Sequence, residues 1–263
     1  MTVCSMICCT GLVFYIESFY RNYIVGQFTK FPEPVAKKLR RALYYTNWDL
    51  QPKNALKYYV EALQVAEELG MSPFSDEIIG VKVQLAAFME KIQEYQKAIQ
   101  ILKILKSDNL RWIDAAKEVP GYAGNRTRIL GKTVGVSVKL GELYANQYVM
   151  ETGNAEKELI WAVETVLKEQ RRREREGVKP DEGDWMTPEE IGGSLEGQSQ
   201  LVKHTAILTC FLALAHHYEE KDQHYLAAPL FLQALTMSPV SSCHTTVLSK
   251  KICTSKRGTF LTI

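Results

Sequence analysis

The sequence has almost no net charge, which argues against a nucleic-acid-binding function. Its 263 residues include 32 Lys and Arg against 30 Asp and Glu, so the formal net charge is +2. A nucleic-acid-binding domain needs a clustered basic face, and this balance gives no such footprint. Hydrophobic residues make up 46% of the chain, enough for one sizeable core or a short repeat array.

Cysteine spacing excludes the common zinc and redox motifs. The sequence contains no CxxC pair, so zinc-ribbon and thioredoxin-like sites are excluded. Cys243 and Cys253 have nine residues between them, a spacing found in oxidised helical hairpins, but such hairpins need two matched motifs. We therefore expect unpaired thiols at all six positions, which are Cys4, Cys8, Cys9, Cys210, Cys243 and Cys253.

The N-terminal apolar run is shorter than the roughly 20 residues that a membrane-spanning helix requires. Val3–Ile16 has fourteen residues, and Glu17 and Arg21 interrupt the hydrophobicity that follows. Aromatic side chains come next, as at a membrane interface, and a basic stretch comes after them. We interpret residues 1–30 as a hydrophobic anchor segment, in preference to a buried helix of a soluble protein. The aromatic and basic residues are Tyr15, Phe19, Tyr20 and Tyr23, then Lys37, Lys38, Arg40 and Arg41.

No pattern in the sequence supports a catalytic or metal site. Gly131–Thr133 resembles the end of a phosphate-binding loop, but arginine stands where the first glycine is needed and no strand is expected there. Three histidines cluster with two glutamates without an HExxH spacing. We expect no enzymatic activity, no cofactor and no bound metal. The clustered residues are His216, His217, Glu219, Glu220 and His224.

The sequence does contain small and large apolar residues at the spacing of a helical hairpin. In Phe211–Pro239, small residues fall where two antiparallel helices would cross, and large ones would fill the grooves beside them. Pro239 lies just past the second helix, where it can end that helix. The offsets match the 34-residue tetratricopeptide (TPR) unit, with an ordinary helical hairpin as the alternative. The matching positions are Leu214, Ala215, Tyr218, Ala227, Phe231 and Ala234.

One TPR unit cannot bury its apolar face alone, so further copies are expected. Three earlier stretches repeat the offsets at spacings longer than 34 residues, which indicates insertions between the units. We predict an all-α fold, a TPR-type α-solenoid of antiparallel helix pairs over residues 31–240. The alanines that match between the copies are Ala55, Ala98, Ala155 and Ala227.

Periodicity and helix-breaking residues predict the individual helices. The mixed-sign run Arg171–Glu176 is expected to be a solvated helix end, because its cations favour the C-terminus of the helix dipole. The predicted elements are two helices within Val35–Leu69 separated near Asp49–Pro52, a helix after Ser75 to Met89, a return helix Tyr95–Lys106, a separate short helix Asp108–Lys117, and long helices Arg126–Met150 and Glu156–Glu176.

Two segments do not follow the repeat. Residues 197–212 break the expected run from Glu196 into Ala213, and we interpret them as an insertion. Translated non-coding sequence is one origin for it, and a continuous spliced message containing these codons would contradict that origin. After Pro239 the periodicity ends, and residues 241–263 are assigned to an irregular tail.

Three segments, Phe31–Thr46, Val136–Ala145 and Ala215–Leu235, carry a family resemblance. They resemble the fungal TPR subunit of the mitochondrial inner-membrane i-AAA protease supercomplex, over most of residues 30–240. The resemblance implies one membrane helix and a TPR domain facing the intermembrane space; the alternative location is cytoplasmic.

The resemblance also implies a role. It implies a non-catalytic adaptor in protein quality control, which binds unfolded or misfolded proteins and delivers them to the AAA protease. The implied partners are the protease, its other adaptor subunits, the unfolded substrates and the membrane. A generic soluble TPR scaffold is the alternative.

A TPR solenoid presents a concave groove lined by the first helix of each unit, which binds extended or helical peptide. The offsets that carry Lys and Asn in carboxylate-binding TPR domains hold other residues here, so we expect no carboxylate clamp. The groove would be mixed apolar and weakly acidic, which favours basic or apolar unfolded segments. Its candidate residues are Val83, Ala87 and Glu90, then Val138, Glu142 and Asn146, then Leu212, His216 and Glu219.

Overall fold

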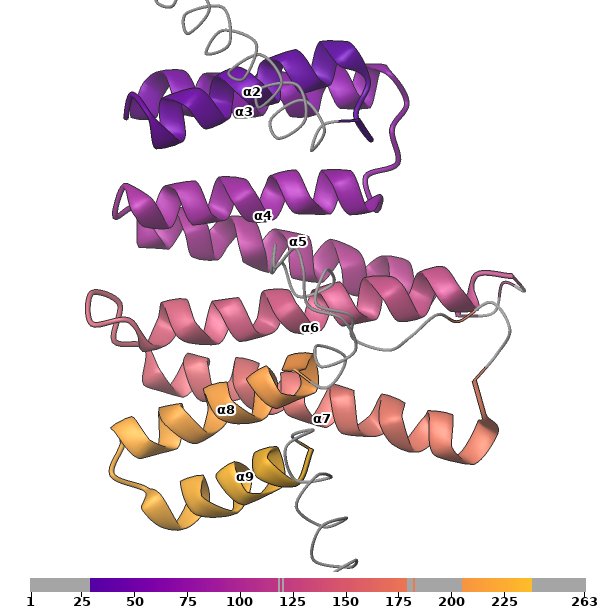
Figure 1. Cartoon of the computed structure of the whole chain (residues 1–263), viewed down its shortest axis with the longest axis vertical. Helices are drawn as coiled ribbons and strands as arrows, with labels where there is room; N and C mark the ends of the chain where they lie inside the picture. The colour runs from indigo at the N-terminus through magenta and orange to yellow at the C-terminus, as the bar shows by residue number, and fades with distance from the viewer. Residues whose placement is uncertain (1–28, 118, 120, 179–181, 183–204, 238–263) are drawn as a thin grey trace, which may run out of the picture. The chain divides into compact units, whose positions relative to one another are not determined.

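The computed structural model describes residues 29–117, 119, 121–178, 182 and 205–237, and all regular structure in these ranges is helical. The helices follow one another as antiparallel pairs (Figure 1). The predicted all-α fold is confirmed. Residues 1–28 of the expected anchor and all of the expected tail lie outside the described residues. The helices are α2 Glu33–Asn47, α3 Pro52–Glu68, α4 Asp76–Lys91, α5 Tyr95–Ala115, α6 Ala123–Ala145, α7 Thr152–Glu176, α8 Thr205–Glu220 and α9 His224–Met237.

The chain divides into two compact units, Met1–Phe88 and Met89–Ile263. In the first unit α2 packs against α3, and the rings of Tyr59 on α3 and Phe88 on α4 lie 5.9 Å apart. In the second unit α6 packs against α5, α7 and α8, and α9 packs against α8. Each unit therefore has its own apolar core between layers of helices.

The four alanines that align the repeats occupy one equivalent position. Each is the fourth residue of the second helix of its pair, and each is at most 2% exposed. A small buried side chain at this position is what a close crossing of two helices requires. Each alanine N–H also donates to the carbonyl of the residue before its helix. These bonds are Ala55 to Gln51 (2.9 Å), Ala98 to Glu94 (3.1 Å), Ala155 to Glu151 (3.0 Å) and Ala227 to Gln223 (3.2 Å).

Two of the turns repeat in atomic detail. Gln93 and Asp222 each lie two residues before the second helix of a pair and adopt a positive φ, 65° and 57°. In both turns this residue donates to the carbonyl three positions back, and the next residue donates to the carbonyl five positions back. Such a left-handed residue ends the first helix and reverses the chain. The α4–α5 and α8–α9 turns therefore share the same backbone conformation and hydrogen bonds, in addition to the shared alanine position.

The two helices of the α6/α7 pair meet at a glycine. A Cβ atom placed on Gly141 would lie 2.6 Å from Cγ of Leu159, a side chain that is 2% exposed. Real Cβ atoms do not approach that closely, so Leu159 would have to move within a packed core. Glycine at this position lets α6 and α7 approach each other.

We expect Gly141→Ala to lower the free energy of unfolding by about 1–3 kcal/mol, because the added methyl overpacks the α6/α7 contact. Gly80→Ala is the matched control: Gly80 is also inside a helix, but a Cβ there meets nothing within 4 Å. The control should be neutral or stabilising by up to about 1 kcal/mol, because alanine favours helix. Urea unfolding of both variants measures the difference, and equal effects would contradict the close approach.

Two predicted boundaries were wrong. Asp108–Lys117 is not a separate helix, because α5 continues from Tyr95 to Ala115. Two polar side chains near the expected break make hydrogen bonds: Ser107 donates to the carbonyl of Ile104, and the buried Asn109 amide group donates to Thr133 on α6. Helix α6 ends at Ala145, five residues before the predicted Met150.

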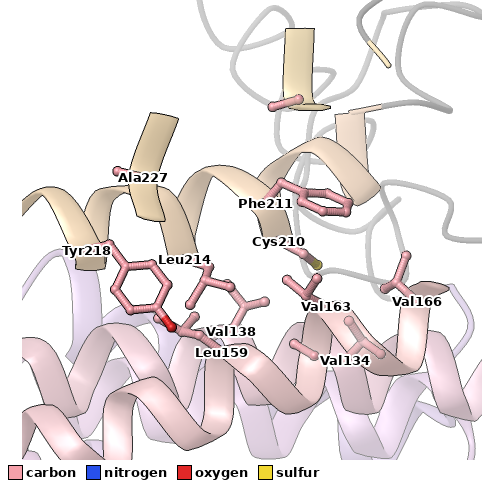
Figure 2. Packing of buried hydrophobic residues seen from close by; sticks show 12 residues of the cluster. Val134, Val138, Leu159, Val163, Val166, Cys210, Phe211, Leu214, Tyr218 and Ala227 are labelled. Carbon is pink, nitrogen blue, oxygen red and sulfur yellow. The ribbon is translucent and has the colours of Figure 1, made fainter. Parts of the chain in front are cut away.

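The segment 197–212, interpreted as an insertion, enters the described residues at Thr205. From Thr205 to Leu212 it forms the first half of α8. Cys210 and Phe211 are 0% and 1% exposed and face α7, as Figure 2 shows. This part of the segment therefore belongs to the packed helices of the second unit.

Candidate polypeptide-binding site

The candidate groove residues lie on the first helices of three pairs, α4, α6 and α8, or directly after them. Val83 and Ala87 belong to the first unit, where Val83 is half-buried and Ala87 is exposed. The other seven belong to the second unit. Most of the predicted site therefore lies within one compact unit.

Glu90 and Glu142 are brought together by a lysine. Nζ of Lys139 lies 3.1 Å from a carboxylate oxygen of Glu90 and 3.3 Å from one of Glu142. Burial acts to lower the pKa of Lys139, but the two carboxylates outweigh it and raise the pKa. One cation therefore offsets one of the two negative charges, and this part of the groove stays weakly acidic, as expected. Sequence reasoning missed Lys139, although its spacing of three residues from Glu142 is that of a helical ion pair.

Val138 and Leu212 meet in the core of the second unit. Val138 is 6% exposed and belongs to a cluster built from α6, α7, α8 and α9, and Leu212 packs partly against it (Figure 2 labels Val138). Helix α6 contacts helices on several sides, so a residue expected on its open face is covered. Both side chains therefore contribute to the packing of this cluster, and Val138 is not open to a bound peptide.

The remaining three candidates lie at or near the ends of α6 and α8. Asn146 follows α6, and its side-chain oxygen accepts a hydrogen bond from the N–H of Tyr148 at 3.0 Å. Nδ1 of His216 lies 3.2 Å from Glu219, and its ring lies 5.3 Å from that of Phe231. His216 and Glu219 are exposed, with Glu142, and these three polar side chains form the accessible part of the predicted site in this unit.

A buried polar cluster ties α5, α6 and α7 together. Nζ of Lys106 donates to Ser137 at 2.8 Å and to Glu158 at 2.5 Å, and it lies 3.8 Å from the centre of the Trp161 ring. Burial lowers the pKa of Lys106, and Glu158 opposes that shift. Ser137 is fully buried and donates to Glu158, so its hydroxyl is directed into the cluster. The group links three helices.

The run Arg171–Glu176 is not a solvated helix end throughout, contrary to the prediction. Side chains of Arg172 and Arg173 are only 17% and 11% exposed. Arg172 contacts Glu169 at 2.6 Å and Glu182 at 2.8 Å, and these carboxylates raise its pKa further. The Glu182 side chain is fully buried and also accepts a hydrogen bond from Thr127 at the start of α6. This cluster joins the end of α7 to α6 through Glu182, which follows α7 in the sequence and is 55 residues from Thr127.

The end of α8 is joined to the start of α7 by a second polar group. Tyr218 donates to Glu156 at 3.1 Å, and Lys221 contacts the same carboxylate at 2.8 Å, which lowers the pKa of Glu156. His217 is next to this group and is 3% exposed. Burial, and then Lys221, lowers the pKa of His217, whereas Glu156, Glu220 and the backbone at Thr152 act in the opposite direction. The folded chain therefore favours neutral His217.

This burial predicts a loss of stability in mild acid. Because the pKa of His217 is lower in the folded than in the unfolded chain, the unfolded chain binds more protons, and stability falls as the pH drops below about 6.5. Binding of one proton at His217 in the unfolded chain lowers the free energy of unfolding by at most about 1.4 kcal/mol for each pH unit. We expect His217→Gln to remove this component. His216→Gln should retain it, because His216 is 63% exposed. Urea unfolding between pH 7.5 and 5 tests this, and parallel profiles for wild type and His217→Gln would contradict it.

The described residues contain neither a group of side chains suited to a metal ion nor a helix suited to a membrane. No group of three or more His, Cys, Asp or Glu side chains in the described ranges could hold a metal ion. Among the helices that the structure describes, none combines the length and the apolar character needed to cross a membrane.

Part of the chain is similar in sequence to a yeast protein. No family model matches the chain. Protein MRG3-like from Saccharomyces cerevisiae is 31% identical over 91 residues, which cover 34% of this chain. The match spans 19% of that relative's length. Among solved structures, BtubC (BKLC) from P. vanneervenii has 17% sequence identity and a TM-score of 0.45, and the match covers 94% of this chain and 75% of that one.

Proposed function

We propose that the chain is a non-catalytic, TPR-type adaptor that binds unfolded or misfolded polypeptides and delivers them to a mitochondrial inner-membrane AAA protease. The observation that supports the proposal best is the repeated hairpin. The four alanines share one position in four helix pairs, and two turns have the same backbone hydrogen bonds. Repeated helix pairs of this kind form extended surfaces that bind peptides.

The exposed residues support a surface that holds unfolded segments loosely. Glu142, His216 and Glu219 are accessible, and Lys139 places a cation between the carboxylates of Glu90 and Glu142. A surface with both charges and few deep contacts suits segments of varied sequence. Delivery to an AAA protease is proposed from the family resemblance alone.

Photo-cross-linking to a chemically unfolded polypeptide tests the site. We expect a Glu142→Ala, His216→Ala double variant to lose most of the cross-links that the wild-type chain forms. A variant with Glu164→Ala and Lys168→Ala is the matched control, because these residues pair with each other on the exposed surface of the second helix α7. Unchanged cross-linking in the first variant would contradict the assignment of the site to the first helices.

The generic scaffold makes a different prediction about membranes. An anchored adaptor should stay in the membrane fraction during carbonate extraction, whereas a soluble scaffold should be released. The proposed inner-membrane location predicts the first result. Release of the full chain would favour the scaffold.

A further inference from the structure

We propose that one side of α2, formed by Lys37, Arg41, Tyr44 and Trp48 and called here the α2 stripe, lies on an anionic membrane surface. The two cations contact lipid headgroups, and the two aromatic rings enter the boundary between headgroups and acyl chains. The inference rests on the membrane attachment in the proposed function and deepens it. It assigns a lipid contact to the folded helices, in addition to the anchor segment before them.

The four side chains of the stripe lie on one side of α2, opposite its core. They are separated by four, three and four residues, so they line a single face of the helix, about 16 Å long. All four are exposed. In the first unit α2 packs against α3 (Figure 1). The residues that α2 buries come from its other side and are Val35, Ala36, Leu39, Ala42 and Thr46.

Trp48 is the most exposed large hydrophobic side chain of the described residues, at 85%. Its backbone N–H donates to the carbonyl of Tyr44 at 2.9 Å, which fixes it at the end of α2. Tyr44 is also exposed, and its ring lies edge-on to that of Tyr45, 5.4 Å away. Tryptophan and tyrosine are enriched where a membrane meets water, because their rings combine an apolar body with a polar group. The aromatic half of the stripe therefore fits a lipid interface.

The charge of α2 selects the sign of that surface. The helix contains four cations and one acid. Two of the cations, Lys38 and Arg40, pair with carboxylates of the protein. The other two, Lys37 and Arg41, belong to the stripe, and the Arg41 guanidinium lies 5.7 Å from the centre of the Tyr58 ring on α3 while its side chain stays exposed. Basic residues close to a membrane are attracted by anionic lipids, so the stripe favours an anionic surface.

Helix α3 has an equivalent stripe of different chemistry. Lys57, Glu61, Gln64 and Glu68 follow the same spacing of four, three and four residues, opposite the buried side of α3. Two of them are acids, none is aromatic, and Nζ of Lys57 lies 3.9 Å from a carboxylate oxygen of Glu61. An anionic surface does not attract this combination. The α3 stripe is therefore a matched control in the same unit.

The place of α2 in the chain favours lipid over an acidic peptide as the occupant. Helix α2 begins at Glu33, directly after residues 1–30, which we interpret as the anchor segment. The three residues from Lys30 to Glu33 span about 10 Å or less. In an anchored chain, headgroups are therefore present at a high effective concentration beside the stripe, and a free peptide would have to displace them.

Lipid cross-linking from the full chain in vesicles tests the contact. Photoreactive benzoylphenylalanine is placed at position 44, or at the equivalent position 64 of the α3 stripe in the control chain. In vesicles of phosphatidylcholine and phosphatidylglycerol, we expect position 44 to cross-link to lipid and position 64 to give background only. In vesicles of phosphatidylcholine alone, the yield from position 44 should fall several-fold.

Two charge variants of the chain with the probe at position 44 test the role of the cations. We expect Lys37→Gln, Arg41→Gln to lower the lipid cross-links several-fold, because each basic residue near an anionic surface strengthens binding about fivefold. Lys53→Gln, Lys57→Gln removes the same charge from exposed positions on α3 and should leave the yield unchanged. Circular dichroism checks that both variants keep the helix content of the unsubstituted chain.

Equal yields from positions 44 and 64 would overturn the proposal, as would a yield from position 44 that depends on neither the anionic lipid nor the two cations. Cross-links from position 44 mainly to residues 1–30, or to added unfolded polypeptide, would identify a different occupant and overturn it as well. Flotation of the same samples separates this inference from the proposed function. A chain that does not float with vesicles contradicts the membrane attachment itself, whereas a floating chain without lipid cross-links at position 44 contradicts only the α2 stripe.

Discussion

Replacing Phe211 with alanine should lower the free energy of unfolding by about 3–5 kcal/mol. The ring is 1% exposed and packs in the cluster formed by α6, α7, α8 and α9. Truncation would leave a cavity among Val163, Val166 and their neighbours, because helices joined on several sides cannot collapse to fill it. Urea unfolding followed by circular dichroism measures the change.

This substitution is informative because Phe211 lies in the segment that the sequence pattern marked as an insertion. An insertion outside the fold would tolerate the change. The control Ile104→Ala removes an exposed side chain from α5, and we expect an effect within about 0.5 kcal/mol. Equal, small effects of both substitutions would contradict the packing of the first half of α8 against α7.

Replacing Arg172 with leucine should also cost about 3–5 kcal/mol at neutral pH. Glu182 is fully buried and would lose the guanidinium that contacts both of its carboxylate oxygens. Arg173 would still contact Glu169, so the loss of the two Arg172 contacts to Glu182 carries most of the effect. The deficit should shrink in acid, because protonation removes that buried charge. Thermal and urea unfolding at two pH values measure both effects.

Two further variants separate loss of the ion pair from loss of side-chain packing. Arg175→Leu changes an exposed arginine in the same helical turn and should be nearly neutral. Adding Glu182→Leu to Arg172→Leu removes the buried charge as well, and we expect it to recover much of the lost stability. No recovery in the double variant would show that the cluster does not depend on charge pairing.

The repeat could be predicted because it is local. The alanine position depends on a close approach of two helices joined by a short turn, and both helices are contiguous in the sequence. For Ala98 and Ala227 the small residue of the first helix is twelve residues earlier, at Ala86 and Ala215. The all-α fold and the pairing of the helices follow from that pattern.

The contacts that the pattern missed are not local in this way. Arg172 pairs with Glu182 beyond the end of its helix, and Lys139 on α6 pairs with Glu90 on another helix. The break predicted near Asp108 is absent because α5 continues to Ala115, and Asn109 in this stretch donates a hydrogen bond to Thr133 on a neighbouring helix. Val138 was expected on an open face, and its burial depends on how many helices surround α6.

The central claim is that this chain holds other polypeptides for an AAA protease and carries out no reaction itself. Affinity purification of the tagged full chain from detergent-solubilised mitochondria tests it most directly. We expect an AAA protease to co-elute, together with cross-linkable unfolded polypeptide that the Glu142→Ala, His216→Ala variant fails to retain. Recovery of the intact chain without any AAA protease would contradict the account.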